Sequence, residues 1–600
     1  MTLPESPHMP RSPAVDTPLL HYARLLAEGD HRALSLLLLD ALDGLANHDC
    51  DGGDEESLAR LDRLFLALAH VLATPEFVIS DRDLALRWIF HARTIASLAA
   101  ASSFGSTDAV LRIVLAQPDN LVKVLALYSC ANSQAIDIGP VFDSNPDLAS
   151  LWRLSILGGD YASLTVGRSA DAVADHLAAL DDPRMLGVPG LLVRPFFFVT
   201  YAAPPVEAKV KAAVNRLIRP MAVQAMTDLP PRPRPDPDHV AVISSLWASD
   251  HAVYRTNARF VASLAGRFKL TLVTSANPGI ETVGFDRVIR LDPQQGLTPL
   301  ADLDAMTAFF PDVGMGEDSI LLANCRLARI QIMSCGHPVS TFGSEMDYFL
   351  SGDEVDNDDT ARRFYSERLL LIPGRGVEAN TIPRPRQFVD KAEDGPLRIA
   401  LPWSMPKLNR RTLDSLRRIA DASPRPVEFH LFAGAGMNGL ALPILRKGLE
   451  AILGPGRTVL YPFLTQDAYW EILASMHLVA DSFPFGGFNT VVDALHFGVP
   501  MVVFEGERAF SRYGAHLMRG LGLGELVVTD HDAYVALLLN LAANGSLRRQ
   551  WEERIRAIDL DAAIQAEDNA RHFRTAVEYL IAHHDDTRSD QWRPPIRIGR

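Results

Sequence analysis

The stretch from Phe483 to Leu523, FPFGGFNTVVDALHFGVPMVVFEGERAFSRYGAHLMRGLGL, constrains the fold more than any other part of the chain. The apolar residues 478–480 before it predict a short buried strand, and Gly486 and Gly487 then allow a tight turn into a helix. Free N–H groups and the positive end of the helix dipole would point at the space over these glycines. The turn therefore predicts a site for an anionic ligand.

The helix after this turn carries further polar side chains. Asn489 and Thr490 are suited to capping its first turn. Asp493 lies one turn after Asn489 on the same face, where a carboxylate is placed to accept hydrogen bonds from sugar hydroxyls. The helix is expected to end at Gly498. Turn and helix together predict a site for a phosphate and a sugar.

Composition excludes several other classes. The chain has 600 residues, of which 48% are apolar, so it is able to bury several cores. With 58 basic and 73 acidic residues the net charge is −15, which argues against a broad nucleic-acid or anionic-membrane surface. The cysteines have no C-x-x-C spacing, and neither a signal peptide nor a long apolar segment is present. We expect a cytoplasmic protein with reduced thiols.

The chain alternates between a helical pattern and strand–helix–strand patterns. Leucines at helical spacing predict an all-α domain, a proline-rich segment predicts a linker, and two later alternations predict doubly wound α/β domains. The predicted organisation is a disordered leader at 1–17, an all-α domain at 18–228, a linker at 229–239, a first Rossmann-like domain at 240–390, a second with a C-terminal helix at 391–584, and a loose tail at 585–600.

The order of motifs after Phe483 resembles a known family. FPFGG, N-T-x-x-D-A-L, G-V-P, G-E-R-x-x-S-R and LGL follow one another over about forty residues, as in the donor half of O-GlcNAc-transferase-class glycosyltransferases. Their bacterial relatives, cytoplasmic N-glycosyltransferases that modify high-molecular-weight adhesins, also have a helical domain without tetratricopeptide repeats. The resemblance implies a GT-B fold, in which two Rossmann-like domains face each other and the ligand lies at the carboxyl ends of the strands.

Two residues are the candidates for catalysis. His251, in the string D-H-A-V-Y-R-T, matches a position that faces acceptor and donor in the family, although a histidine at a helix start is more often a cap. Lys407, in S-M-P-K-L-N after a strand, matches a lysine that contacts phosphate and stabilises the leaving group. The residues that the resemblance and the turn assign to the donor are Arg255, Ser404, Asn438, Gly486, Gly487, Asn489, Thr490 and Asp493.

Other positions carry less specific signals. His337, in a Gly-His-Pro turn, is equally compatible with lining the cleft and with supporting the fold. Arg508 and Arg512 match arginines near the donor loop or acceptor groove of the family. Two positions depart from it: Asn257 stands where the adhesin-modifying enzymes have a second histidine, and Phe488 stands where a small or polar residue is expected.

The predicted function is metal-independent, inverting transfer of a hexose from a UDP-sugar, with UDP-glucose expected, to asparagine in N-x-Ser/Thr sequons of proteins such as adhesins. Asp-x-Asp strings occur, but none follows a predicted strand, so no metal and no other cofactor is expected. Two alternatives remain open. One is O-linked transfer to Ser or Thr, and the other is an adaptor that binds a nucleotide sugar without catalysis.

Overall fold

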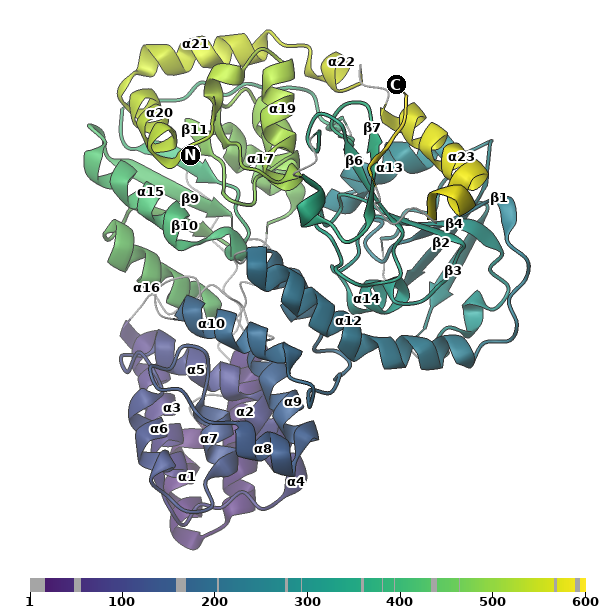
Figure 1. Cartoon of the computed structure of the whole chain (residues 1–600). Helices are drawn as coiled ribbons and strands as arrows, with labels where there is room; N and C mark the ends of the chain where they lie inside the picture. The colour runs from purple at the N-terminus through teal and green to yellow at the C-terminus, as the bar shows by residue number, and fades with distance from the viewer. Residues whose placement is uncertain are drawn as a thin grey trace. The chain divides into compact units, whose positions relative to one another are not determined.

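A computed structural model of the whole chain describes residues 17–47, 55–157, 169–201, 204–275, 279–292, 294–357, 361–379, 381–392, 394–432, 440–462, 464–565, 569–588 and 594–599 (Figure 1). The chain divides into two compact units. One consists of Met1–Val173 with Gly434–Ala451, and the other of Ala174–Ala433 with Ile452–Arg600. We call them the helical unit and the α/β unit.

The helical unit follows the predicted leucine pattern. Leu34, Leu38 and Leu42 recur at helical spacing and are buried. Lys447 donates from Nζ to the carbonyls of Ala100 (3.3 Å) and Ser102 (3.0 Å), which lie at the end of a helix where carbonyls lack intrahelical partners. The helices are α1 (Thr17–Glu28), α2 (His31–Asn47), α3 (Glu55–Ala73), α4 (Arg82–Phe90), α5 (Ala92–Ala101), α6 (Asp108–Leu115), α7 (Leu121–Leu127), α8 (Gly139–Ser144), α9 (Pro146–Leu157) and most of α16 (Ala441–Leu453), while α10 (Ser169–Ala178) crosses the boundary.

The first sheet of the α/β unit has eight described strands in the order β14-β7-β6-β5-β4-β1-β2-β3, and all of its pairings are parallel. Parallel strands are buried on both faces, which agrees with their continuous apolar runs. The strands are β1 (Asp236–Ile243), β2 (Lys269–Ser275), β3 (Arg287–Leu291), β4 (Ala305–Phe310), β5 (Ile330–Met333), β6 (Tyr348–Gly352), β7 (Arg368–Ile372) and β14 (Ile596–Arg597).

Successive residues of β1 enter two separate cores. Ala241 and Ile243 belong to a core on one face of the sheet, and Val240 and Val242 belong to the core on the other face. The other helices and 3₁₀ helices of the α/β unit are η2 (Ala179–Asp181), α11 (Val193–Phe198), η3 (Val199–Tyr201), α12 (Pro204–Thr227), α13 (Ala252–Leu264), η4 (Thr298–Leu300), α14 (Glu317–Ala323), η5 (Ala361–Phe364), η6 (Met405–Lys407), α15 (Arg410–Ala422), α17 (Gln466–Ala474), α18 (Asn489–His496), η7 (Ala509–Ser511), α19 (Tyr513–Gly520), η8 (Gly524–Leu526), α20 (His531–Ala543), α21 (Gly545–Arg556), α22 (Leu560–Gln565) and α23 (Asn569–Arg588).

The second sheet has six described strands, also parallel, in the order β10-β9-β8-β11-β12-β13. The order reverses direction between β8 and β11, and ligands of open α/β sheets bind at such switch points. Lys407 follows β8, and the glycine turn follows β11. The strands are β8 (Leu397–Leu401), β9 (Val427–Phe432), β10 (Thr458–Tyr461), β11 (Leu478–Ala480), β12 (Met501–Phe504) and β13 (Val527–Val528).

The structure differs from the predicted organisation at both ends of the α/β unit. Helix α12, predicted within the all-α domain, buries Ala222 in a core of the first sheet. Helix α23, predicted with the second domain, packs against α13 (Figure 1). The ring centroids of Phe573 and Phe260 lie 5.1 Å apart at this contact. The tail predicted to be loose contains β14, which pairs with β7. These differences arise from long-range packing that local sequence patterns do not record. Within the described ranges, no helix combines the length and the apolar character needed to cross a membrane.

Candidate active site

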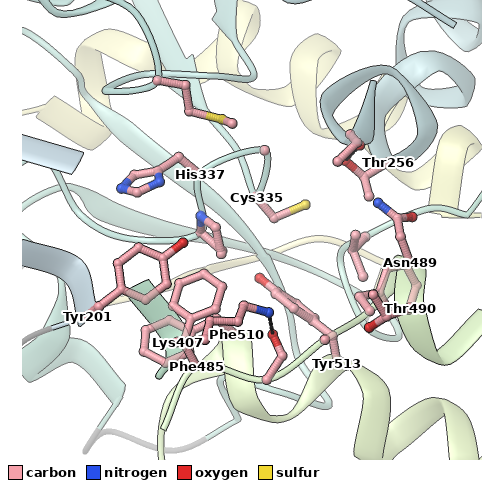
Figure 2. A pocket seen from close by; sticks show the side chains of 18 of the residues that line it. Tyr201, Thr256, Cys335, His337, Lys407, Phe485, Asn489, Thr490, Phe510 and Tyr513 are labelled. Atoms are coloured by element: carbon pink, nitrogen blue, oxygen red, sulfur yellow. Dashed lines mark hydrogen bonds between the residues drawn. The ribbon is translucent and has the colours of Figure 1, made fainter. Parts of the chain in front are cut away.

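A pocket of about 250 Å³ lies in the α/β unit (Figure 2). This volume is close to the lower end of the range of small-molecule sites in proteins. It is bounded by α11 and η3, by the start of α13, by the turn after β5 and by the glycine turn before α18. The lining residues are Phe197, Tyr201, Ala252, Thr256, Met315, Cys335, Gly336, His337, Pro338, Val377, Lys407, Phe485, Gly486, Gly487, Phe488, Asn489, Thr490, Phe510 and Tyr513.

The glycine turn requires residues without a side chain. A Cβ atom on Gly486 would lie 3.2 Å from the carbonyl oxygen of Phe510 and 3.3 Å from Oδ2 of Asp481. A Cβ atom on Gly487 would overlap with Oγ1 of Thr490. Bare backbone therefore lines this part of the pocket, as a close approach to a ligand requires.

The first turn of α18 leaves polar atoms without protein partners. The residue before the helix is Phe488, and no side chain caps the first turn, so the predicted capping by Asn489 and Thr490 is wrong. Both are instead the first helical residues and line the pocket. Within the described chain, the buried Oδ1 atom of Asn489 accepts no hydrogen bond. Buried polar atoms are normally satisfied, so this atom is available to a ligand.

Lys407 ends η6 directly beside the glycine turn. Its Nζ donates to the carbonyl oxygen of Gly486 at 3.3 Å and lies 5.3 Å from the ring centroid of Phe485 (Figure 2). Burial lowers the pKa of Lys407, and the nearby carboxylate of Asp481 acts in the opposite direction. A cation held at this position is suited to stabilise negative charge on a diphosphate.

Aromatic rings form the wall next to Lys407. Phe485 is stacked on Phe510, with ring centroids 4.4 Å apart and an interplanar angle of 13°, and Tyr201 covers it at 4.9 Å. Phe197 covers His337 in the same way, at 4.9 Å. Apolar rings beside a charged group lower the local dielectric constant, which strengthens electrostatic interactions there.

His337 is buried at the edge of this wall. Its Nε2 lies 3.1 Å from Oγ1 of Thr200. Burial, together with the positive charges of Lys211 and Arg508, lowers the pKa of His337 well below its usual value, so the imidazole is neutral. Of the two roles predicted for His337, the structure therefore supports both: it lines the pocket and it bonds to η3.

Known proteins resemble this chain in sequence and in structure. A UDP-glucose:protein N-beta-glucosyltransferase of Actinobacillus pleuropneumoniae serotype 5b (strain L20) is 23% identical over 520 residues, which cover 80% of this chain and 82% of that protein. A probable UDP-N-acetylglucosamine–peptide N-acetylglucosaminyltransferase SPINDLY of Hordeum vulgare is 25% identical over 247 residues, which cover 40% of this chain and 26% of that protein. No family model matches the chain.

Among solved structures, a mutant of the Thermobaculum terrenum O-GlcNAc transferase matches with a TM-score of 0.52 and 17% identity, covering 94% of this chain and 98% of that chain. The chain is a relative of protein glycosyltransferases. The sequence relatives confirm the kinship and the enzyme class predicted from the motifs. The structural match and the two parallel sheets confirm the predicted GT-B fold.

In the present chain, the side chain of His251 is hydrogen-bonded within the protein. It is the N-cap of α13, and its Nδ1 accepts a hydrogen bond from the backbone N–H of Val253 at 3.2 Å. Burial lowers its pKa, which favours the neutral ring that can accept this bond. His251 does not line the pocket itself, although its neighbour Ala252 does. Its catalytic role stays a prediction.

Asn257 stands where the adhesin-modifying enzymes that the motifs resemble have a second histidine. Its side-chain amide has hydrogen-bond partners within the protein. Asn257 is fully buried, donates to the carbonyl of Val253 at 2.9 Å and accepts from the hydroxyl of Ser334 at 2.6 Å. It therefore joins α13 to the end of β5. An amide suits this place because it can donate and accept at once.

Arg255 and Asp493, both assigned to the donor, contact each other. The guanidinium of Arg255 lies 2.8 Å from Oδ1 of Asp493, and the two side chains are 11% and 3% exposed. Neither lines the pocket. In this structure the pair joins α13 to α18, and the predicted contacts of Asp493 with a sugar and of Arg255 with phosphate stay predictions.

The remaining predicted residues are scattered. Ser404 is exposed and directly precedes η6. Burial raises the pKa of Tyr201, and a hydrogen bond with Ser404 acts in the opposite direction. Asn438 lies outside the described residues. Arg508 pairs with Glu207 at 2.5 Å, and Arg512 donates to the carbonyl of Val355. These two arginines thus tie the segment after β12 to α12 and to the segment after β6.

Sequence reasoning missed several residues in or beside the pocket. Phe197 and Tyr201 come from an aromatic run that is typical of a buried core, and no motif marks them as pocket residues. Asp481 was also missed, although an aspartate directly after a buried strand and before a glycine turn is a usable signal. In the part of the chain that the structure describes, no cluster of three or more His, Cys, Asp or Glu side chains is arranged to hold a metal ion.

Proposed function

We propose that this chain is a metal-independent inverting glycosyltransferase that transfers glucose from UDP-glucose to the side-chain amide of asparagine in N-x-Ser/Thr sequons. The relative from Actinobacillus pleuropneumoniae, named a UDP-glucose:protein N-beta-glucosyltransferase, aligns with four fifths of the chain and supports both the donor and the linkage. Adhesin-type proteins before export are the acceptor class that the sequence resemblance suggests.

The observation that carries the proposal is the position of Lys407. Its ammonium group lies 3.3 Å from the carbonyl of Gly486, at the turn that leads into the N-terminus of α18. In the proposed transfer, the amide nitrogen forms a bond to C1 of glucose while the bond from C1 to the β-phosphate oxygen breaks. The electron pair of that bond passes to UDP, where Lys407 and the start of α18 stabilise the added charge. The amide proton leaves to solvent base.

A second function is O-linked transfer to serine or threonine. The alignment with SPINDLY of Hordeum vulgare, named a probable peptide N-acetylglucosaminyltransferase, favours it over 40% of the chain. The motif G-E-R-A-F-S-R, which resembles the O-GlcNAc class, also favours this function. The two functions differ in the atom that is glycosylated, so one experiment separates them.

The test is mass spectrometry of an N-x-Thr peptide after incubation with the purified full-length protein, a chelator, and UDP-glucose, UDP-galactose or UDP-GlcNAc in separate reactions. A peptide with Gln in place of Asn and a peptide with Ala in place of Thr are the matched controls. We expect a hexose on Asn from UDP-glucose in the presence of the chelator, and no product from either control peptide.

Other results contradict parts of the proposal. A sugar on Thr in the peptide that lacks Asn would establish the O-linked function. Product that appears only without the chelator would contradict metal independence. UDP binding without transfer from any donor to any of the peptides would favour a non-catalytic adaptor.

A further inference from the structure

Asp481 occupies a special position at the end of β11. It is 2% exposed, and its Oδ1 accepts hydrogen bonds from the backbone N–H groups of Ser482 (2.9 Å) and Gly487 (3.0 Å). The bond to Gly487 spans the whole turn FPFGG and closes it. Because a hydrogen bond to a charged group is stronger than one between neutral groups, this carboxylate is suited to hold the turn in one conformation.

The second oxygen of Asp481 is free for another role. Oδ2 is buried, faces the backbone of Gly486, and has no hydrogen-bond partner among the residues that the structure describes. An isolated buried carboxylate oxygen is costly, so a nearby positive charge is expected. Lys407 supplies that charge, because its Nζ binds the carbonyl of the same Gly486.

The charges of the two groups act on each other. Burial raises the pKa of Asp481 to about 7, and the charge of Lys407 acts against this rise. Burial lowers the pKa of Lys407, and the charge of Asp481 acts against this fall. Tyr534 is a further titratable neighbour: its hydroxyl donates to the backbone carbonyl of Asp481 at 2.6 Å, and its own pKa is raised by burial and by that carboxylate.

We infer that Asp481 is a positioning residue of the donor site, which closes the glycine turn through Gly487 and acts as the counter-ion that holds the Lys407 ammonium beside Gly486. This inference rests on the proposed function, since it gives Lys407 the task of stabilising a diphosphate. Asp481 itself does not line the pocket, so it acts through the turn and through the lysine.

The first measurement follows Lys407 directly and needs no substrate. The chain contains seven lysines, so reductive methylation with ¹³C gives few resonances, and the one lost in Lys407→Arg identifies Lys407. In Asp481→Asn the amide oxygen can still accept the two backbone hydrogen bonds, but the negative charge is gone. We expect the titration midpoint of Lys407 to fall by about one pH unit in Asp481→Asn and to be retained in Asp481→Glu.

The second measurement is the affinity for UDP by calorimetry between pH 6 and 10. UDP binding that depends on a protonated lysine is present below the pKa of Lys407 and is lost as the pH rises through it. We therefore expect the alkaline loss of affinity to move to lower pH in Asp481→Asn, by the same amount as the titration midpoint. Asp356→Asn removes another buried aspartate, which accepts from Ser351 and Tyr365, and should leave the pH profile unchanged.

The outcomes separate the inference from the proposed function. An unchanged Lys407 midpoint in a folded Asp481→Asn variant would overturn the inference, as would equal loss of UDP affinity at every pH. If the midpoint moves but wild-type protein binds no UDP, the proposed function fails, and with it the role of Asp481 in a donor site. A folding defect in Asp481→Asn that Asp481→Glu does not share would support the closing of the glycine turn by a charged carboxylate, because the amide of Asn accepts weaker hydrogen bonds from Ser482 and Gly487.

Discussion

The start of α13 and the turn before α18 both bring polar side chains to the region of the pocket, but they use them differently. At α13, His251 caps its own helix, and Arg255 is paired with Asp493. At the turn before α18, Lys407 bonds to a backbone carbonyl, and Oδ1 of Asn489 has no partner among the described residues. Side chains already satisfied by the protein hold the fold, whereas unsatisfied ones can receive a ligand. The donor site is therefore expected to depend on the second sheet far more than on α13.

The largest effect is expected on stability, when the buried ion pair that joins the two regions is removed. Arg255→Ala and Asp493→Ala should each lower the free energy of unfolding by about 3–5 kcal/mol, because each leaves an unpaired buried charge. Urea unfolding measures this effect. Asp421→Asn, which breaks an exposed pair with Arg417, is the control and should change the free energy of unfolding little. A loss of UDP affinity in Asp493→Asn without loss of stability would show instead that Asp493 serves the donor.

The second largest effect is expected when the positively charged side chain at the glycine turn is removed. We expect Lys407→Ala to lower kcat for transfer by roughly 100- to 1,000-fold, as when one preorganised group that stabilises developing charge is lost. Initial rates with saturating UDP-glucose and peptide measure this change. Lys447→Ala removes a lysine that bonds to α5 in the helical unit and does not line the pocket, so it is the control for the loss of a lysine outside the site. Activity retained in Lys407→Ala would contradict the assignment of leaving-group stabilisation to this residue.

A smaller effect is expected from filling the glycine turn. Gly487→Ala places a methyl group against Thr490 and should weaken UDP binding by about tenfold, which is ~1.4 kcal/mol. Gly520→Ala is the matched control, since a Cβ atom there meets no atom within 4 Å. Calorimetry with UDP compares the two variants. Equal affinities would mean that the ligand does not approach the bare backbone of the turn.

The smallest effect is expected at His251. Asparagine is a good N-cap, so His251→Asn should keep both the helix and the activity, whereas His251→Ala should cost about 1 kcal/mol of stability through the lost cap. Thermal unfolding and transfer rates report on the two roles separately. A large loss of kcat in His251→Asn, at unchanged stability, would restore the catalytic role predicted from the sequence and break the contrast between the two regions.

Local features of the fold were accessible from the sequence. The strand at 478–480 is present as predicted, because it is a short apolar run followed by turn residues. The pairing of Arg255 with Asp493 joins residues that are 238 positions apart, and the return of β14 to β7 is similarly distant in the chain. No local pattern carries such information. The motif match assigned both Lys407 and the glycine turn to the donor, and the structure places them next to each other. It could not show that Asp493 forms an ion pair with Arg255.

The most direct test of the central claim compares the affinities of UDP and uridine by titration calorimetry, for the wild-type protein and for Lys407→Met. The difference between the two ligands isolates the contribution of the diphosphate. We predict that the wild-type protein binds UDP far more tightly than uridine and that Lys407→Met loses most of this preference while its affinity for uridine is unchanged. An equal preference for UDP in both proteins would contradict the claim that Lys407 and the turn before α18 hold the diphosphate.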